Sequence, residues 1–188
     1  EKIDKIVAPF RAKTGVKLLD YSNDEDHNRL VVTVVGGQRF KQAVLEAIGV
    51  AVELIDLNKH SGQHPRMGAV DVVPFIPIRG CTMEEAIALS KEVGEEVGTR
   101  YAVPVFLYEK SASAPYRENL AAIRKGELRG WQRKSINRSG NLFGPAERHP
   151  TAGTVAIGAH AFVAYNVNLG TNQLHIATDI AKKNPFHR

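Results

Sequence analysis

Cysteine is almost absent from this chain of 188 residues, in which Cys81 is the single one. One cysteine cannot form an intrachain disulfide, and it cannot supply the thiolate cluster of a structural zinc site. A lone cysteine is most often a small packed residue, and we expect this of Cys81. The chain is therefore predicted to work in a reducing compartment, the cytoplasm, without cysteine cross-links.

Long apolar runs are also missing. No stretch approaches the roughly 18–20 apolar residues that a membrane-spanning helix needs, and no secretory signal peptide is visible. Apolar residues make up 43% of the sequence and charged residues 24%, which is typical of a globular domain with an ordinary core. We expect residues 1–188 to form a single domain without membrane association.

Several catalytic templates are absent. The sequence has no G-x-S-x-G nucleophile elbow, no phosphate-binding G-x-x-x-x-G-K-[ST] and no G-x-G-x-x-G after a strand. These absences argue against an α/β-hydrolase, a nucleotide triphosphatase and a dinucleotide-binding domain. Any catalytic residues must therefore lie outside these three motifs.

Negative charge is in the minority. Lys and Arg total 25 against 20 for Asp and Glu, which gives +5 and a pI near 9.4. This balance favours an anionic partner but does not identify one. A basic group, Arg129, Arg133, Lys134 and Arg138, surrounds Trp131. It is a solvated loop, a site for the anionic tail of a metabolite, or a nucleic-acid contact, and no RNA-binding or zinc-finger signature supports the last.

Hydrophobic periodicity predicts the secondary structure. Helices are expected near 1–13, 38–57, 82–98, 115–125 and 172–182, and strands near 16–22, 29–35, 70–78, 103–108, 153–158 and 161–168. Adjacent strand pairs mixed with helices indicate an α+β fold with a mixed or antiparallel sheet and helices on one face. The opposite face must then be covered by something else.

Two local signals refine this prediction. Pro74 and Pro77 cannot donate to a β-ladder, so the strand at 70–78 should lie at a sheet edge. Thr82 followed by Glu85 forms a capping-box pattern, which predicts the start of a helix there.

Two loops, 58–69 and 126–152, are long enough to suggest function. In the first, His60 and His64 have the four-residue spacing of a helical zinc site, but Gly62 and Pro65 argue against a helix. The two histidines are therefore exposed loop residues, or one of them is a general acid/base, since imidazole titrates near neutral pH. Arg66 could supply an anion-binding fork.

The string IDLNKHSGQHPRMGAVDVVPFIPIRG at 55–80 resembles the glutamate formiminotransferase family, which includes the transferase part of formiminotransferase-cyclodeaminase. Its core is H-x-G-x-H-P-R-M-G-A-x-D. The resemblance continues through LLDYS (18–22), HNR (27–29), VPVFLYE (103–109), NLAAIRKGE (119–127), HPTAG (149–153) and AYNVNL (164–169). It therefore covers essentially the entire chain.

The resemblance implies a ferredoxin-like α/β sandwich, the amino-terminal subdomain of the transferase. It implies transfer of a formimino group from N-formimino-L-glutamate to tetrahydrofolate, the co-substrate, in histidine degradation and one-carbon metabolism, without a metal. His64 maps onto the catalytic histidine, which manages protons as a general acid/base. The folate-binding segment maps onto Gly144, Pro145, Ala146, Glu147, Arg148, His149, Pro150, Thr151, Ala152 and Gly153. Asp20 and Arg66 are possible supporting residues.

The chain also departs from the family pattern. Gln63 stands where the family usually has glutamate, the opening N-F-S-E-G strand is not in the sequence, and 129–141 is more basic than usual. We expect the carboxy-terminal subdomain to be absent, because the sequence stops at Arg188. The alternative function is therefore a non-catalytic folate-binding module that acts alone or with a separate partner subunit. Because an uncovered apolar sheet face is a large exposed patch, we also expect the chain to form a homodimer or to pair with a separate carboxy-terminal subdomain.

Overall fold

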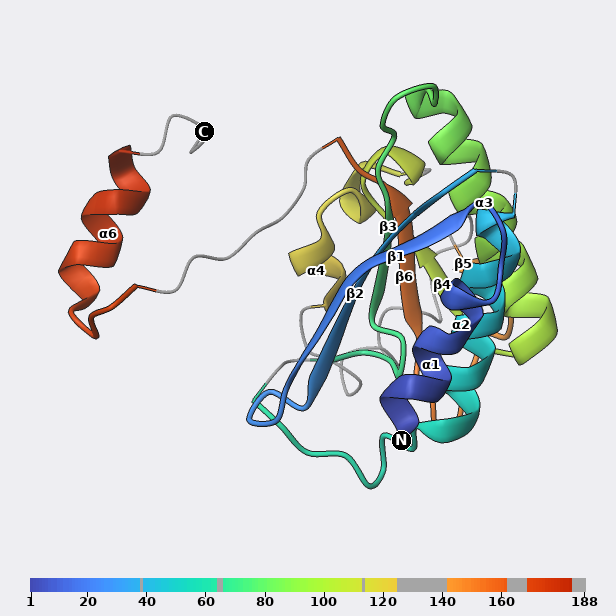
Figure 1. The fold of residues 1–188 in the computed structure, drawn as a ribbon, viewed down its shortest axis with the longest axis horizontal. Coiled ribbons are helices and arrows are strands. Elements are labelled where there is room, and N and C mark those ends of the chain that lie inside the picture. Colours follow the sequence, from blue (N-terminus) through green and yellow to red (C-terminus); the bar gives the residue numbers. More distant parts are fainter. Residues whose placement is uncertain (38, 64–65, 113, 125–141, 162–168, 184–188) are drawn as a thin grey trace.

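The structure is a computed structural model that describes residues 1–37, 39–63, 66–112, 114–124, 142–161 and 169–183 (Figure 1). The helices are α1 (Lys2–Arg11), α2 (Phe40–Leu54), α3 (Met83–Tyr101), α4 (Leu120–Arg124) and α6 (Leu174–Lys183), with 3-10 helices η1 (Glu109–Ser111) and η2 (Pro115–Arg117). The strands are β1 (Val16–Asp24), β2 (Arg29–Gly36), β3 (Val72–Phe75), β4 (Val105–Leu107), β5 (Leu142–Phe143) and β6 (Val155–Ala159).

The α+β class predicted from the sequence is confirmed, but the described strands divide between two sheets. Strands β1 and β2 form an antiparallel hairpin. The second sheet is mixed, with the order β3-β6-β4-β5; β3 and β4 both run parallel to β6, and β5 runs antiparallel to β4. A hairpin needs only a short turn, whereas parallel strands in one sheet need a crossover connection. Helix α3 lies in the crossover between β3 and β4, the two parallel strands on either side of β6.

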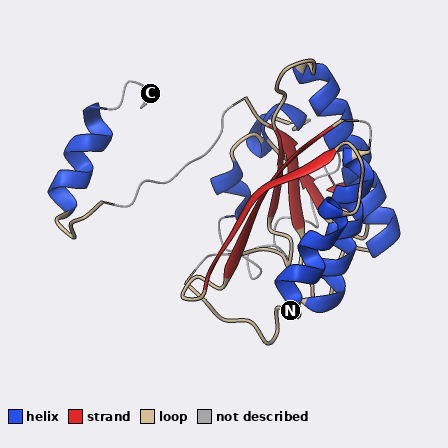
Figure 2. Cartoon of the chain, viewed as in Figure 1, coloured by secondary structure: helices blue, strands red, loops and turns tan. Residues whose placement is uncertain are grey.

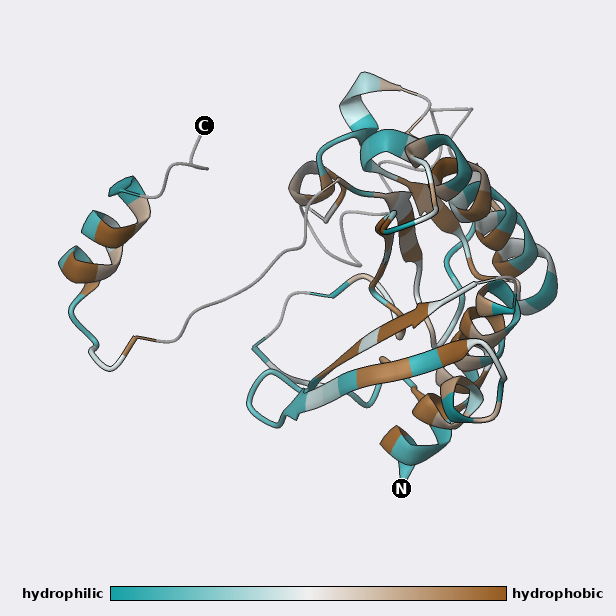
Figure 3. Cartoon of the chain, turned by 45° about the horizontal axis from the view of Figure 1, so that its top comes forward, coloured by the Kyte–Doolittle hydropathy of each residue, from teal (hydrophilic) through white to brown (hydrophobic). Residues whose placement is uncertain are grey.

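The three long amino-terminal helices lie together on one side of the strands (Figure 2). Helix α3 packs on β4 and β6, α1 packs on the hairpin, and α2 lies between the two helices. Their apolar faces share one core with both sheets, in which Leu45, Val93, Val105 and Ile157 are almost completely buried. Figure 3 shows that β2 is largely hydrophobic, that β1 alternates hydrophobic and hydrophilic residues, and that the hairpin tip is hydrophilic.

The opposite face of the mixed sheet is partly covered by the chain itself. Phe106 of β4 and Tyr108, which follows that strand, form a second buried cluster with Met67, Ala156 and Ile123, the last of these from α4. Burial raises the pKa of the Tyr108 phenol well above its usual range. This cover reduces the apolar surface on which the predicted self-association rested.

The two local signals at strand and helix ends are confirmed. Strand β3, which contains Pro74, lies at the edge of its sheet. Helix α3 begins with the predicted capping box, in which the Glu85 amide donates to the Thr82 hydroxyl and the Thr82 amide donates to the Glu85 carboxylate. The prediction of a packed Cys81 is wrong, because this residue lies in the exposed turn that precedes the cap.

The predicted helix at 115–125 is interrupted. The Glu118 carbonyl accepts a hydrogen bond from the Glu109 amide at 3.1 Å, and this contact ties the chain to η1 between η2 and α4. The predicted strand at 161–168 falls almost entirely on residues outside the described ranges. Helix α6 has no buried residue and lies apart from the other elements (Figure 1). Over the described residues, every helix is too short or too polar to cross a bilayer.

Candidate functional site

The two long loops singled out in the sequence meet at the amino ends of β3 and β6. An isolated β-bridge joins Gly68 to Gly153. Beside it, the Ala69 amide donates a hydrogen bond to the Ala152 carbonyl at 2.9 Å. Since β3 and β6 are parallel neighbours, the segments that precede them leave the sheet at the same edge. The tertiary structure thereby places the carboxy-terminal end of the first loop, at Gly68 and Ala69, against the predicted folate segment.

The contact between these loops depends on Gly68. A Cβ atom at this position would lie 1.7 Å from the Thr154 carbonyl oxygen, a backbone atom that has little freedom to move. The Thr154 amide also donates to the Met67 carbonyl at 3.0 Å. The glycine of the H-P-R-M-G motif is therefore required by close approach of two backbones.

His149 shapes the second loop. Its backbone exchanges two hydrogen bonds with Gly153, at 3.0 and 3.1 Å. Its ring Nδ1 accepts from the amides of Thr151, at 3.3 Å, and Ala152, at 3.0 Å. Because Nδ1 is an acceptor, the neutral ring carries its proton on Nε2 and presents a donor there.

A third segment is tied to the same loop. The Leu57 amide donates to the Thr151 carbonyl at 2.8 Å, and the Asn58 side-chain amide donates to the Pro150 carbonyl at 3.0 Å. The backbone amide of Asn58 donates to the Asp56 carboxylate at 3.0 Å, which holds the pKa of that carboxyl below its usual range. The segment that follows helix α2 is therefore joined to the predicted folate segment by hydrogen bonds.

The tip of the β1–β2 hairpin contacts the first loop. The Arg66 guanidinium donates to the His27 carbonyl at 2.8 Å, and the Gln63 amide donates to the Asp26 carbonyl at 3.1 Å. A Cβ at Gly62 would lie 2.6 Å from both the Arg66 guanidinium and the His27 carbonyl, so this glycine is also required by close approach. Arg66 thus positions the loop, and its proposed role toward an anion stays a prediction.

Asp20 does not take part in this contact. It is exposed, lies beside a bulge in β1 and is registered opposite Thr33 of β2. Four strand residues, or about 13 Å, separate it from the end of β1 at Asp24, where the tip begins. Its predicted supporting role remains a prediction.

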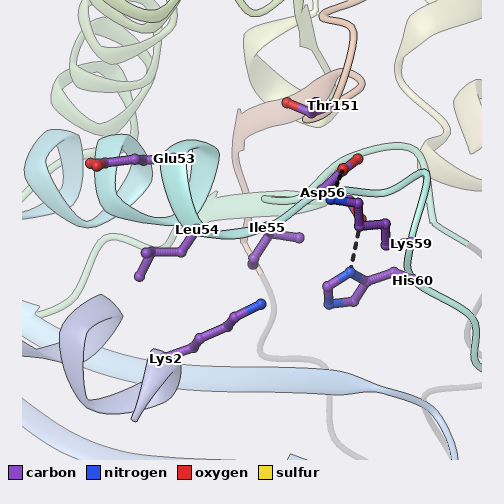
Figure 4. Close-up of a pocket in the computed structure, with 8 residues that line it drawn as sticks. All are labelled: Lys2, Glu53, Leu54, Ile55, Asp56, Lys59, His60 and Thr151. Atoms are coloured by element: carbon purple, nitrogen blue, oxygen red, sulfur yellow. Dashed lines mark hydrogen bonds and ion pairs between the residues drawn. The ribbon is translucent and has the colours of Figure 1, made fainter.

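A cavity of about 490 Å³ lies beside the joined loops (Figure 4). It is lined by Lys2, Glu53, Leu54, Ile55, Asp56, Lys59, His60 and Thr151. His60 is half-buried, and its Nδ1–H donates to the Asp56 carbonyl at 2.9 Å. Since a carbonyl can only accept, the neutral His60 ring keeps an acceptor lone pair on Nε2. His60 and His149 therefore present opposite functions at Nε2.

The predicted folate segment is anchored at both ends by glycines. Gly144 has a φ of +83°, and Gly153 has a φ of +70°, a region that favours glycine. Gly144 also packs against Gly98 of α3, where an added Cβ would lie 2.6 Å from the Gly144 amide nitrogen. Between these anchors, Ala146, Glu147 and Arg148 are exposed. The segment thus offers accessible groups between fixed ends.

Some predicted site residues lie outside the described ranges. They include His64, Pro65 and the basic group at 129–138. Residues 60–63 are not helical, which agrees with the argument against a helical histidine pair. Among the residues described, no three His, Cys, Asp or Glu side chains gather where they could hold a metal ion. The expectation that the site needs no metal stays a prediction.

Sequence reasoning missed three contributors to this region. Asp71 accepts a hydrogen bond from the Met67 amide at 2.7 Å and so fixes the turn after the motif. Its place at the end of the H-x-G-x-H-P-R-M-G-A-x-D pattern was a usable signal. Gly98 was a usable signal too, because a glycine inside a helix often marks close packing. The third contributor is Arg117, whose guanidinium stacks on the Phe106 ring of the buried cluster that contains Met67. No pattern in the sequence pointed to it.

The structure is an α+β domain in which backbone-rich loops meet at one edge of a sheet, beside a cavity, an arrangement typical of small-molecule sites. The particular family follows from comparison with known proteins. The model of the formiminotransferase domain, N-terminal subdomain, matches residues 1–160. The chain belongs to this family.

Curated relatives agree with this assignment. A glutamate formimidoyltransferase of Streptococcus pyogenes serotype M1 is 46% identical over 183 residues, which cover 96% of this chain and 61% of the relative. One from Thermoplasma acidophilum is 37% identical over 186 residues, again 61% of its length. A formimidoyltransferase-cyclodeaminase of Dictyostelium discoideum is 43% identical over 175 residues, 91% of this chain and 33% of the relative. The chain thus spans about three fifths or less of these relatives.

Proposed function

We propose that this chain is the amino-terminal part of a glutamate formimidoyltransferase. The reaction would move the formimino group of N-formimino-L-glutamate to tetrahydrofolate. The observation that carries the proposal is the backbone junction at Gly68 and Gly153, which brings the end of the H-P-R-M-G motif, Met67 and Gly68, beside the predicted folate segment. Family membership and the relatives' names support it.

His64 is the proposed general acid/base. The folate N5 attacks the formimino carbon, a carbon–nitrogen bond forms, and the N5 proton passes to His64. The bond from that carbon to the glutamate nitrogen then breaks, and His64 returns the proton to the leaving amine. An imidazole that titrates near neutral pH suits both transfers. The neighbours Gln63 and Arg66 are both tied to the hairpin tip, which supports a defined position for the loop.

The segment from Gly144 to Gly153 is proposed to hold the folate. Fixed glycine ends allow a flat ring to approach the backbone closely. The Nε2–H of His149 offers a donor next to this backbone, and His60, whose Nε2 is an acceptor, lines the same cavity as Thr151. These groups suit a heterocycle that carries both donors and acceptors.

The test is a turnover assay with N-formimino-L-glutamate and tetrahydrofolate, in which glutamate release is followed for the wild type and His64→Ala. General acid/base catalysis contributes about 10²–10⁴-fold, so the variant should lose at least 100-fold in rate. His175→Ala is the matched control, because His175 is an exposed residue of α6. Full turnover in His64→Ala would refute the assigned role.

The alternative is a folate-binding module without turnover, and Gln63 beside His64 favours it. Tetrahydrofolate binding without glutamate release in the wild type would support this alternative. We propose that a carboxy-terminal subdomain or a second copy of the chain completes the pocket. Sedimentation velocity tests the homodimer, and the cytoplasmic location stays a prediction from the single cysteine.

A further inference from the structure

Arg117, at the end of η2, is a buried cation without a counter-ion among the described residues. Its side chain is 5% exposed. Its Nε is shielded from solvent and has no hydrogen-bond acceptor among the same residues. Burying a charge is costly unless it is paired, and an unmade hydrogen bond at Nε adds to that cost. A guanidinium in this state is suited to an anion that the described part of the chain does not supply.

Two aromatic rings hold the guanidinium in place. Its Cζ lies 4.5 Å from the centroid of the Phe106 ring and 5.5 Å from that of Tyr116. Cation–π contact uses the face of the guanidinium and leaves its N–H groups free at the edge. Arg117 is therefore oriented by stacking while its Nε–H stays unpaired.

Three other arginines in the described part of the chain use their donors differently. Arg66 donates to the His27 carbonyl, and Arg11 donates to the Tyr21 hydroxyl at 3.2 Å while it stacks on the same ring. Arg100 is paired with Glu96 on α3. Arg29 shares the unpaired buried Nε of Arg117 but is only half-buried, so Arg117 combines an unpaired Nε with the deeper burial.

Arg117 also lies close to the candidate site. Phe106, on which it stacks, belongs to the buried cluster that contains Met67, three residues after His64 in the H-P-R-M-G motif. Ala156, registered beside Phe106, belongs to the same cluster and lies two residues after Thr154, whose amide donates to the Met67 carbonyl. The guanidinium therefore lies on the sheet face that adjoins the junction of the two loops.

We propose that Arg117 binds a carboxylate of the ligand with a two-pronged guanidinium contact. This inference rests on the proposed function, because both proposed substrates carry glutamate carboxylates. The carboxylate belongs to the glutamate portion of N-formimino-L-glutamate or to the glutamyl tail of the folate. Arginine matches the planar geometry of a carboxylate, which lysine does not. Arg117 thus acts as a binding residue that sets specificity for glutamate-bearing ligands.

The test is a titration of the full chain with three probes: L-glutamate, tetrahydrofolate and tetrahydropteroate, which lacks the glutamyl tail. The side-chain Nε–H signal of Arg117 is followed by ¹⁵N NMR, and affinities are measured by calorimetry. Arg117→Lys should weaken binding of the recognised ligand on the order of tenfold, because the point charge remains but the fork is lost. Arg11→Lys is the matched control, since Arg11 stacks on a ring at the surface.

The three probes distinguish the two ligands that could supply the carboxylate. A shift of the Arg117 signal with L-glutamate assigns the contact to the amino-acid substrate. A shift with tetrahydrofolate but not with tetrahydropteroate assigns it to the folate tail. No shift with any probe that binds, in the wild-type chain, overturns the inference, and this result does not depend on how the variants fold.

The outcomes also separate this inference from the proposed function. Glutamate binding with a shifted Arg117 signal but no turnover would overturn the transferase proposal alone. Turnover that Arg117→Lys leaves unchanged would overturn the carboxylate contact alone.

Discussion

Substitution of Gly68 by alanine tests whether the site depends on contact between two backbones. The added Cβ would lie 1.7 Å from the Thr154 carbonyl oxygen. Both atoms belong to rigid backbone, so the overlap is relieved only if the two loops separate. Separation breaks the hydrogen bonds from Ala69 to Ala152 and from Thr154 to Met67.

The magnitude follows from these two hydrogen bonds. Thr154 and Ala152 are almost completely buried, so broken bonds leave polar groups unsatisfied, at about 1–3 kcal/mol each. We therefore expect Gly68→Ala to lower the free energy of unfolding by about 2–6 kcal/mol. With a urea dependence of about 2 kcal/mol per molar, the unfolding midpoint should fall by about 1–3 M.

Urea denaturation followed by circular dichroism measures this change, and calorimetry with tetrahydrofolate measures the effect on the proposed site. Gly37→Ala is the matched control, because an added Cβ there meets nothing within 4 Å and the backbone is not in the left-handed region. Its midpoint should stay close to that of the wild type. A Gly68→Ala protein with an unchanged midpoint and unchanged folate affinity would refute the reasoning.

Two further predictions concern the scaffold. Ser111→Ala should lower the free energy of unfolding by about 1–3 kcal/mol. The buried Ser111 hydroxyl accepts from the Ala159 amide at 2.8 Å and lies 2.6 Å from the Ser90 hydroxyl, so its loss leaves a buried donor unpaired. An unchanged urea midpoint would contradict this prediction. The hydrogen bond from Lys13 lowers the pKa of Glu46, so its stabilisation is present above the unfolded pKa, about 4.3, and is lost as pH falls through the lower folded value. Because Glu46 is 40% exposed, the effect should stay below about 1 kcal/mol, and Glu46→Gln should flatten stability between about pH 5 and 3 by that amount; an unaltered acid profile would count against the pair.

Local signals in the sequence determined most of the secondary structure. The Thr82–Glu85 pattern predicted the start of α3, and Pro74 predicted an edge strand, because capping and ladder donors depend on residues close in sequence. The packed Cys81 was predicted from residue type alone, and it failed because burial depends on what lies opposite in space.

The division of the strands into two sheets had no local signal. Hydrophobic periodicity shows which residues form a strand, but it does not show which strand is its neighbour. Strand β6 inserts between β3 and β4, although α3 and β4 precede it in the chain. That order is set by how the helices and strands pack into a shared core.

The sequence by itself determined the family, the loop motifs and the identities of the proposed acid/base and folate residues, since these are properties of short strings such as HPRMG and HPTAG. Only the tertiary structure decided that Gly68 meets Gly153 and that Arg117 is buried against Phe106. The physical reason is that close approach and burial depend on chain segments far apart in sequence. The residues next to Gly68 or Arg117 in the sequence do not show which distant segment each will contact in the folded chain.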